Sequence, residues 1–214
     1  ENGGAIYIAG TDTNISESSF ETCNARGPSN NQGGWGGAIY IQGANTNIEK
    51  SNFTLCNALR SDSRGGAIAI NGENTIIKES HFDNCDAVRG GDIYVFGNYA
   101  RIEDSTLDES SATYGGAVYL DAWGAVIKGS IITECSATYS GGAIYVAGGG
   151  TNIIDSDFEL CRAEGTTYTR GGGAIFISGP DTHISNSDFN DNRVSSNNAC
   201  GGTIYIEGER TIID

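Results

Sequence analysis

One short phrase is written eight times along this chain, and it limits what the chain can fold into. The phrase is GGAIYI or a close variant, and its first glycine stands at positions 3, 36, 65, 90, 115, 141, 172 and 201. Consecutive copies are 25 residues apart (65 to 90) to 33 residues apart (3 to 36), and the length varies only just before each glycine pair. A unit of this size is too small to bury an apolar face alone, so the repeats have to stack on one another.

Four apolar positions recur in each repeat at fixed places after the glycine pair. The first two are two residues apart, like Ile6 and Ile8, which is the spacing of a strand with one buried face. The third is isoleucine, as at Ile15, and the fourth is phenylalanine, leucine or isoleucine, as at Phe20. Each repeat therefore predicts three short strands, usually with a glycine such as Gly10 at the sharp corner after the first.

Stacked units of this kind predict an all-β fold. We expect residues 1–214 to form a single domain, a right-handed parallel β-helix of about eight rungs of 25 or more residues with three short strands per rung. Composition agrees, because 32 glycines and a lack of Ala/Leu/Lys-rich stretches disfavour helices. The glycine pair is interpreted as scaffold, since a phosphate-binding loop would need a following helix and usually a lysine.

The charge of the chain limits its partners. Its formal net charge of -15 repels nucleic acid and anionic membrane surfaces, and no basic cluster offsets it. No apolar run approaches about 18 residues, so we expect no transmembrane segment. The chain has no methionine and no signal-peptide pattern, so we expect it to derive from a longer precursor. We also expect no cofactor and no metal, because no cysteine spacing resembles a metal site.

Stacking turns each column of the repeat into a ladder along the fold. The most uniform polar column consists of Ser18, Ser51, Ser80, Ser105, Ser130, Ser156 and Ser187. We expect these hydroxyls to satisfy buried polar groups. A catalytic role is disfavoured, because no histidine or lysine stands at a fixed distance to activate a serine.

A second column holds five of the six cysteines, namely Cys23, Cys56, Cys85, Cys135 and Cys161. Ser110 and Asn192 take the remaining places in this column. Neighbouring rungs bring the Cα atoms within disulfide range, but parallel side chains hold the Cβ atoms too far apart, so buried thiols are favoured over intrachain bridges. Cys200 lies in a variable corner insertion and is a candidate for an intermolecular disulfide, with a free surface thiol as the alternative.

An aromatic column points outward between the two isoleucines of the first strand. Its members are Tyr7, Tyr40, Tyr94, Tyr119, Tyr145, Phe176 and Tyr205, with Ala69 at one rung. We expect this aromatic stripe to lie on the surface and either to pack laterally against another solenoid or to stack on sugars, with packing preferred. Two sequons also place Asn14 and Asn52 at outward positions, as candidate N-glycosylation sites.

The insertions and the ends of the chain carry two further expectations. Residues 26–35, 164–171 and 195–200 all precede a glycine pair, so they should protrude from one edge of the solenoid. Open strand edges and apolar side chains in the first and last rungs predict head-to-tail stacking of copies. The residues at these stacking edges are Gly3, Ile6, Ile8, Ile204, Ile206 and Ile213.

The repeat also resembles a known kind of surface protein. GGA[IV] is paired with Phe-x-x-Cys or Phe-x-x-Asn, as from Phe20 to Cys23 and from Phe189 to Asn192, over nearly the whole chain. In this the chain resembles the repeats of chlamydial polymorphic outer-membrane proteins and of adhesin-like surface proteins of methanogenic archaea. It is similar in kind to methanogen sheath-type structural proteins. The resemblance implies a right-handed parallel β-helix at the cell surface and names no ligand.

These observations predict an extracellular structural protein of the cell surface, a homopolymer assembled head to tail and laterally into a filament, ring or sheath. Other envelope proteins or glycans are further expected partners. The first alternative is an adhesin passenger domain that binds carbohydrate or protein. The second is a polysaccharide-degrading enzyme, whose candidate patch consists of Asp92, Arg101, Asp104, Asp121 and Lys128. We expect no enzyme activity, because these charges are equally explained as solvated side chains on regular rungs.

Overall fold

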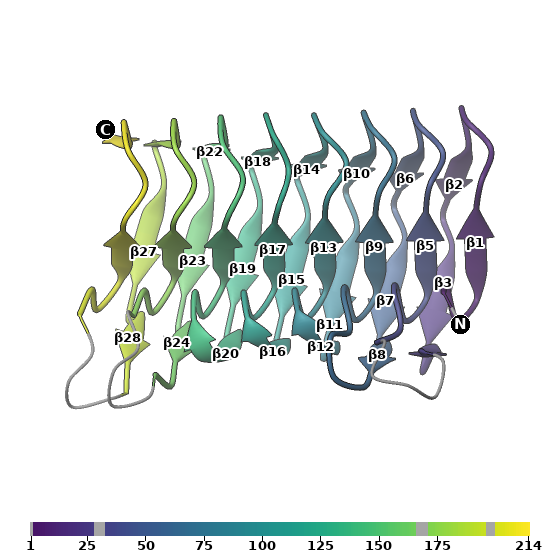
Figure 1. The fold of residues 1–214 in the computed structure, drawn as a ribbon, viewed down its shortest axis with the longest axis horizontal. Coiled ribbons are helices and arrows are strands. Elements are labelled where there is room, and N and C mark those ends of the chain that lie inside the picture. Colours follow the sequence, from purple (N-terminus) through teal and green to yellow (C-terminus); the bar gives the residue numbers. More distant parts are fainter. Residues whose placement is uncertain (1, 28–32, 166–170, 196–199) are drawn as a thin grey trace.

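The chain folds into a long stack of short strands (Figure 1). The computed structural model describes residues 2–27, 33–165, 171–195 and 200–214, and all regular elements in them are strands of two to five residues. Like strands of successive repeats pair in parallel and in register, as Ile6–Ile8 does with Ile39–Ile41. The expected all-β parallel solenoid is therefore confirmed, while its right-handed sense stays a prediction.

Four sheets run along the stack. Sheet 1 consists of β1 (Ile6–Ile8), β5 (Ile39–Ile41), β9 (Ile68–Ile70), β13 (Ile93–Val95), β17 (Val118–Leu120), β21 (Ile144–Val146), β25 (Ile175–Ile177) and β29 (Ile204–Ile206). Sheet 2 consists of β2 (Asn14–Ser16), β6 (Asn47–Glu49), β10 (Ile76–Lys78), β14 (Arg101–Glu103), β18 (Val126–Lys128), β22 (Asn152–Ile154), β26 (His183–Ser185) and β30 (Ile212–Ile213). Sheet 3 consists of β3 (Ser19–Glu21), β7 (Asn52–Thr54), β11 (His81–Asp83), β15 (Thr106–Asp108), β19 (Ile131–Thr133), β23 (Asp157–Glu159) and β27 (Asp188–Asn190). Sheet 4 consists of β4 (Asn24–Arg26), β8 (Asn57–Leu59), β12 (Asp86–Arg89), β16 (Ser111–Tyr114), β20 (Ser136–Ser140), β24 (Arg162–Ala163) and β28 (Arg193–Val194).

Sheet 4 adds a fourth strand to each full turn, whereas the sequence predicts three strands per rung. Each full turn has four corners, and in the second turn these are Gly36, Asn45, Lys50 and Leu55, with φ angles of 64°, 57°, 50° and 54°. Glycine and asparagine favour positive φ angles and therefore indicate a left-handed corner in a sequence, whereas lysine and leucine do not. The strand after the fourth corner also points an alanine inward, such as Ala58, and alanine gives little strand signal.

The glycine pair is explained by two separate constraints. Its first member has a positive φ angle, as at Gly36, and so forms a corner. Its second member lies against the backbone of sheet 4 and of the next turn. A Cβ atom on Gly37 would lie 2.0 Å from the Gly66 oxygen and 2.6 Å from the Asn57 nitrogen, so only glycine fits there. The pair is therefore part of the scaffold, as the sequence predicts.

The four apolar columns point into one core that runs the length of the stack. Side chains of the middle turns are fully buried, and the rings of Phe53 and Phe82 stack with their centroids 4.8 Å apart. In the end turns the same columns are partly open to solvent, and Ile206 and Ile213 are 42% and 51% exposed. Burial of these ladders is the main gain in folding such a repeat.

The insertions leave the stack at one corner. The described ends of all three, at Arg26, Glu164 and Ser195, continue from strands of sheet 4. Residues 28–32, 166–170 and 196–199 lie outside the described residues. At the far ends of the insertions, the described residues 33–35, 171 and 200 precede the next strand of sheet 1, so the described parts of all three lie between sheet 4 and sheet 1.

Replacing Gly37 by alanine should destabilise the fold by about 3 kcal/mol or more, because the added methyl group would overlap backbone atoms that have no room to move. Gly202→Ala is the matched control. Gly202 holds the same place in the last described turn, and a Cβ atom there meets nothing within 4 Å. Urea unfolding followed by circular dichroism measures both changes. Equal losses of stability in the two variants would contradict the close approach at Gly37.

Candidate functional site

The serine column holds corners together from turn to turn. The Ser51 backbone N–H donates to the Ser80 Oγ at 3.2 Å, and the Ser51 Oγ donates to the Glu49 carbonyl at 2.9 Å. The same pair of bonds recurs along the column, as at Ser105 and Ser130. Each hydroxyl therefore satisfies backbone groups beside a left-handed corner residue, and the column is structural.

The cysteine column has the same role at the next corner. The Cys56 thiol contacts the Thr54 carbonyl and the Phe20 carbonyl, each at 3.5 Å. Asn192 takes this place in the last full turn, where its Nδ2 donates to the Phe158 carbonyl at 2.9 Å. Cysteine, serine and asparagine can all serve in this column because each provides a short side chain that bonds to turn carbonyls.

All six cysteines are free thiols in the structure. Those at 56, 85, 135 and 161 are buried, Cys23 is half-buried and Cys200 is exposed. Burial raises the pKa of Cys135 well above its usual range. The hydrogen bond with Cys85 lowers the pKa of Cys56 to about 7, but this thiol is buried like those of Cys85, Cys135 and Cys161. Reagents in solution therefore cannot reach the four interior thiols, which should be inert in the folded state.

Iodoacetamide should therefore alkylate the native protein in a fixed order. Cys200 reacts first and Cys23 follows more slowly, while the other four react only when the protein is unfolded. Peptide mass spectrometry after timed labelling, with and without guanidinium, measures this order. Rapid labelling of Cys85 or Cys135 under native conditions would contradict the buried ladder.

Asp92 takes the place of alanine inside the glycine phrase, as Thr203 does in the last copy. Its side chain is buried in the core, where the Ser110 Oγ donates to its Oδ1 at 2.6 Å. Its Oδ2 has no hydrogen-bond partner among the described residues. Ser110 is the one serine in the cysteine column, so two of the exceptions to the repeat pattern lie in contact. Burial raises the pKa of Asp92 well above its ordinary value of 3.8.

This carboxyl group should make stability depend on pH. The unfolded chain releases the proton near pH 3.8 while the folded chain retains it, so the contribution is full below that pH and is lost as pH rises toward the raised pKa. Asp92→Asn stays neutral and removes this dependence, and it should be about 1–3 kcal/mol more stable than the native chain near neutral pH. Denaturant unfolding of both proteins from pH 4 to 8 measures the difference. A difference that does not change with pH would show that Asp92 is not desolvated.

The charges of the candidate catalytic patch do not converge. Asp92 lies inside the core, whereas Lys128 is exposed on the outer face of sheet 2. The Arg101 Nε donates to its neighbour Glu103 at 2.7 Å, and Asp121 accepts a hydrogen bond from the Tyr94 hydroxyl at 3.0 Å beside sheet 1.

Among the described residues, no group of three or more histidine, cysteine or acidic side chains is arranged to hold a metal ion. That part of the chain also contains no helix of the length and apolarity needed to span a bilayer.

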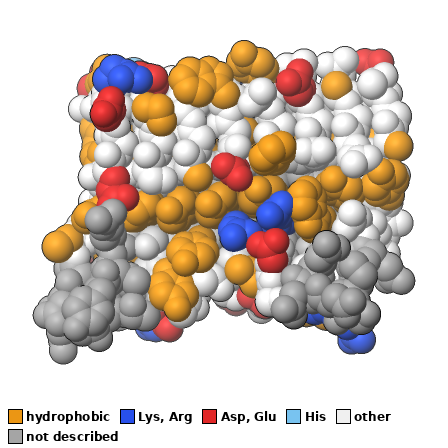
Figure 2. Space-filling model, in the orientation of Figure 1, with side chains coloured by type: hydrophobic (Ala, Val, Ile, Leu, Met, Phe, Trp, Pro, Cys, Tyr) orange, Lys and Arg blue, Asp and Glu red, His pale blue; other side chains and the backbone are white. Residues whose placement is uncertain are grey.

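The aromatic stripe lies on the outer face of sheet 1, and its rings stack from turn to turn. The ring centroids of Tyr119 and Tyr145 are 4.8 Å apart at an interplanar angle of 5°, and those of Tyr145 and Phe176 are 4.7 Å apart. Figure 2 shows hydrophobic side chains as a band along this face, with basic side chains lying on it near the middle. The column is thus formed as the sequence predicts.

Corner residues nevertheless cover part of the stripe. Trp35 packs edge-on against Tyr40 at 5.4 Å and Tyr94 at 6.2 Å, and so occupies the gap beside Ala69. The Arg64 guanidinium lies 4.4 Å from the centre of the Trp35 ring in a cation–π contact. Tyr40 and Tyr94 are only 4% and 2% exposed, and Phe176 is buried as well, so the expected surface stripe does not hold there. Tyr7, in contrast, is 50% exposed.

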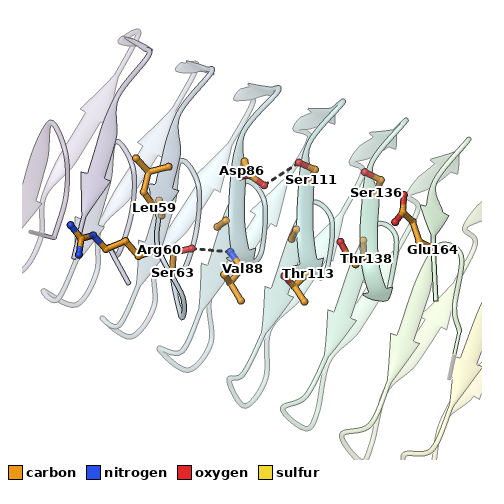
Figure 3. A pocket seen from close by; sticks show the side chains of 14 residues that line it. Leu59, Arg60, Ser63, Asp86, Val88, Ser111, Thr113, Ser136, Thr138 and Glu164 are labelled. Atoms are coloured by element: carbon orange, nitrogen blue, oxygen red, sulfur yellow. Dashed lines mark hydrogen bonds between the residues drawn. The ribbon is translucent and has the colours of Figure 1, made fainter. Parts of the chain in front are cut away.

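A groove crosses the outer face of sheet 4 (Figure 3). It holds about 260 Å³ and extends over β8, β12, β16 and β20. Two rows of side chains line it, one of Asp86, Ser111 and Ser136 and the other of Val88, Thr113 and Thr138. Leu59 and Arg60 stand at one end of the groove and Glu164 at the other.

The polar groups of this groove are largely free to bind something else. The Ser111 Oγ donates to the Asp86 Oδ1 at 3.1 Å. Withdrawal from water raises the pKa of Asp86, although the Ser111 hydrogen bond lowers it. Within the described part of the chain, the hydroxyls of Thr113, Ser136 and Thr138 have no hydrogen-bond partner. The groove therefore presents donors and acceptors on three successive turns.

A second hollow adjoins the groove at Ser136. It holds about 440 Å³, and its lining consists of Glu134, Ser136, Leu160, Arg162, Asp191 and Arg193. Because Glu134, Leu160 and Asp191 are corner residues, this second hollow lies at the corner before sheet 4, and the groove on the outer face of sheet 4 alone is called the trough. Sequence reasoning missed the trough because it predicted no fourth strand. The available signal was the tetrapeptide SATY, which occurs at 111–114 and again at 136–139.

The other predicted site residues lie at the surface or at the ends of the stack. Asn14 and Asn52 are exposed at the start of β2 and β7. In the first turn Ile8 is buried and Ile6 is half-buried, whereas Ile206 in the last turn is exposed. β1 and β29 carry the same sequence, Ile-Tyr-Ile, at the two edges of sheet 1.

Comparisons with protein-family models, with curated proteins and with solved structures gave no match for this chain.

Proposed function

We propose that the chain is a structural element of an extracellular cell-surface layer, in which copies of the solenoid stack end to end. The observation that carries this proposal is the identity of β1 and β29, which are the two edge strands of sheet 1 and share the sequence Ile-Tyr-Ile. Pairing of β29 with β1 of a second copy would repeat the register that β25 and β29 already have. Such a contact is open and generates filaments or large rings.

Exposed apolar side chains add a driving force to this pairing. Ile206, Ile212 and Ile213 are 42%, 56% and 51% exposed, and stacking of a second copy would remove them from water. Unpaired edge strands are also templates for further strands. The surface location rests on the resemblance of the repeat to cell-surface proteins. Lateral packing through the aromatic stripe has less support, because Tyr40 and Tyr94 are covered.

Binding of a ligand, as in an adhesin, is a second candidate function. The trough on sheet 4 favours it, because three hydroxyls there have no partner within the described residues. The two functions use different surfaces, one at the ends of the stack and the other on its side.

End-to-end stacking is tested by a charge at the exposed edge. Ile206→Lys should shift the protein from chains of copies to monomers, because a buried unpaired ammonium group opposes the contact. Ile131→Lys is the matched control, since Ile131 is 45% exposed but lies in the middle of sheet 3. Sedimentation velocity and electron microscopy measure the size of the assemblies. A native chain that remains monomeric at high concentration, or equal loss of assembly in both variants, would overturn the proposal.

A further inference from the structure

The trough on sheet 4 has the length for an extended ligand. It extends over four successive strands, β8, β12, β16 and β20. Neighbouring strands are about 4.8 Å apart, so the trough is roughly 14 Å long. A chain of several units laid along the axis would therefore contact one turn after another.

The chemistry of the lining favours a ligand that is rich in hydroxyl groups. Thr113, Ser136 and Thr138 each offer one donor and two acceptor positions. The carboxylates of Asp86 and Glu164 accept hydrogen bonds from hydroxyl donors. Large apolar side chains are scarce in this part of the trough, where Leu59 and Val88 are the main ones. An apolar ligand would find little surface to cover.

Two other classes of ligand fit less well. An extended peptide usually binds by adding a strand to an unpaired sheet edge. Here the trough presents the face of sheet 4, whose strands already pair with each other, as Ser136 N–H does with the Ser110 carbonyl at 2.9 Å. An anionic polymer would be repelled by Asp86, Glu164 and the net charge of -15.

We propose that the trough on the outer face of sheet 4 binds a neutral, unbranched oligosaccharide, whose hydroxyl groups bond to Thr113, Ser136 and Thr138 and to the Asp86 carboxylate. This inference deepens the second candidate function and is independent of end-to-end stacking, because the trough lies on the side of the solenoid. Regular spacing of the turns brings the same pair of hydroxyl rows to successive units of the ligand. The proposed binding site is thus formed by the strands of sheet 4, which the sequence did not predict.

The test uses the Ile206→Lys chain, so that assembly does not influence the result. The probes are neutral hexasaccharides, namely α- and β-linked glucans, a β-linked mannan and an N-acetylglucosamine hexamer. An oligogalacturonate and a hexapeptide of alternating threonine and glycine serve as anionic and peptide probes. Isothermal titration calorimetry measures affinity, and amide chemical shifts map the site. At least one neutral hexasaccharide should bind and shift the amides of β12, β16 and β20.

Replacing two threonines of the trough by valine removes two hydroxyl groups and keeps the side-chain shape, so it tests whether the ligand binds in the trough. Thr113→Val together with Thr138→Val should weaken binding about tenfold, because two hydrogen bonds are lost. Thr106→Val, at an outward position of β15 on sheet 3, is the matched control and should leave affinity unchanged. Circular dichroism checks that both variants keep the fold. The proposal is overturned if no neutral probe binds at probe concentrations up to about 10 mM, which would detect even a weak specific affinity. It is equally overturned if both variants bind alike, or if the peptide or the anionic probe shifts the trough amides instead.

Discussion

Four left-handed corners per turn are the constraint on which this fold depends. Each strand contains only two to five residues, so no sheet would form unless every turn placed its corners over those of the next. Residues such as Lys50, Leu55 and Glu79 adopt φ angles near 50°, which costs a non-glycine residue about 1–2 kcal/mol. Side chains of the following residues offset this cost, because Ser51 and Cys56 bond to carbonyls of the corner and of the neighbouring turn. The repeated serine and cysteine columns are thus the means by which strained corners are held in register.

The sequence allowed the apolar ladders to be predicted, because a period of two residues and a recurring phenylalanine are strong signals. It did not allow the fourth strand to be predicted. That strand begins after corners such as Leu55 and Glu109, whose residue types give no sign of a left-handed conformation, and it buries only an alanine. The trough depends on this strand, so it was missed for the same reason. The burial of Tyr40 and Tyr94 was also missed, since only the fold brings Trp35 and Arg64 over them.

The interior and exterior side chains of the solenoid have different roles. Inside, every column serves the stacking, and even the exceptions form a contact, as Asp92 and Ser110 do. Outside, the side chains vary from turn to turn without affecting the corners, and this is where specificity can develop. The trough lies on the outer face of sheet 4, whereas the proposed stacking contacts lie at the two ends of the solenoid. The proposed binding and the proposed stacking therefore use different surfaces.

Amide hydrogen exchange tests the four-cornered turn most directly. The backbone N–H groups of Asn57, Ser111 and Ser136 donate to carbonyls of the preceding turn at 2.8 to 3.0 Å, as do their counterparts in the other sheets. In the middle turns, sheet 4 should therefore be protected to the same degree as sheets 1 to 3. Exchange of these three amides at the rate of an unstructured loop, with protection confined to three strands per turn, would contradict the account.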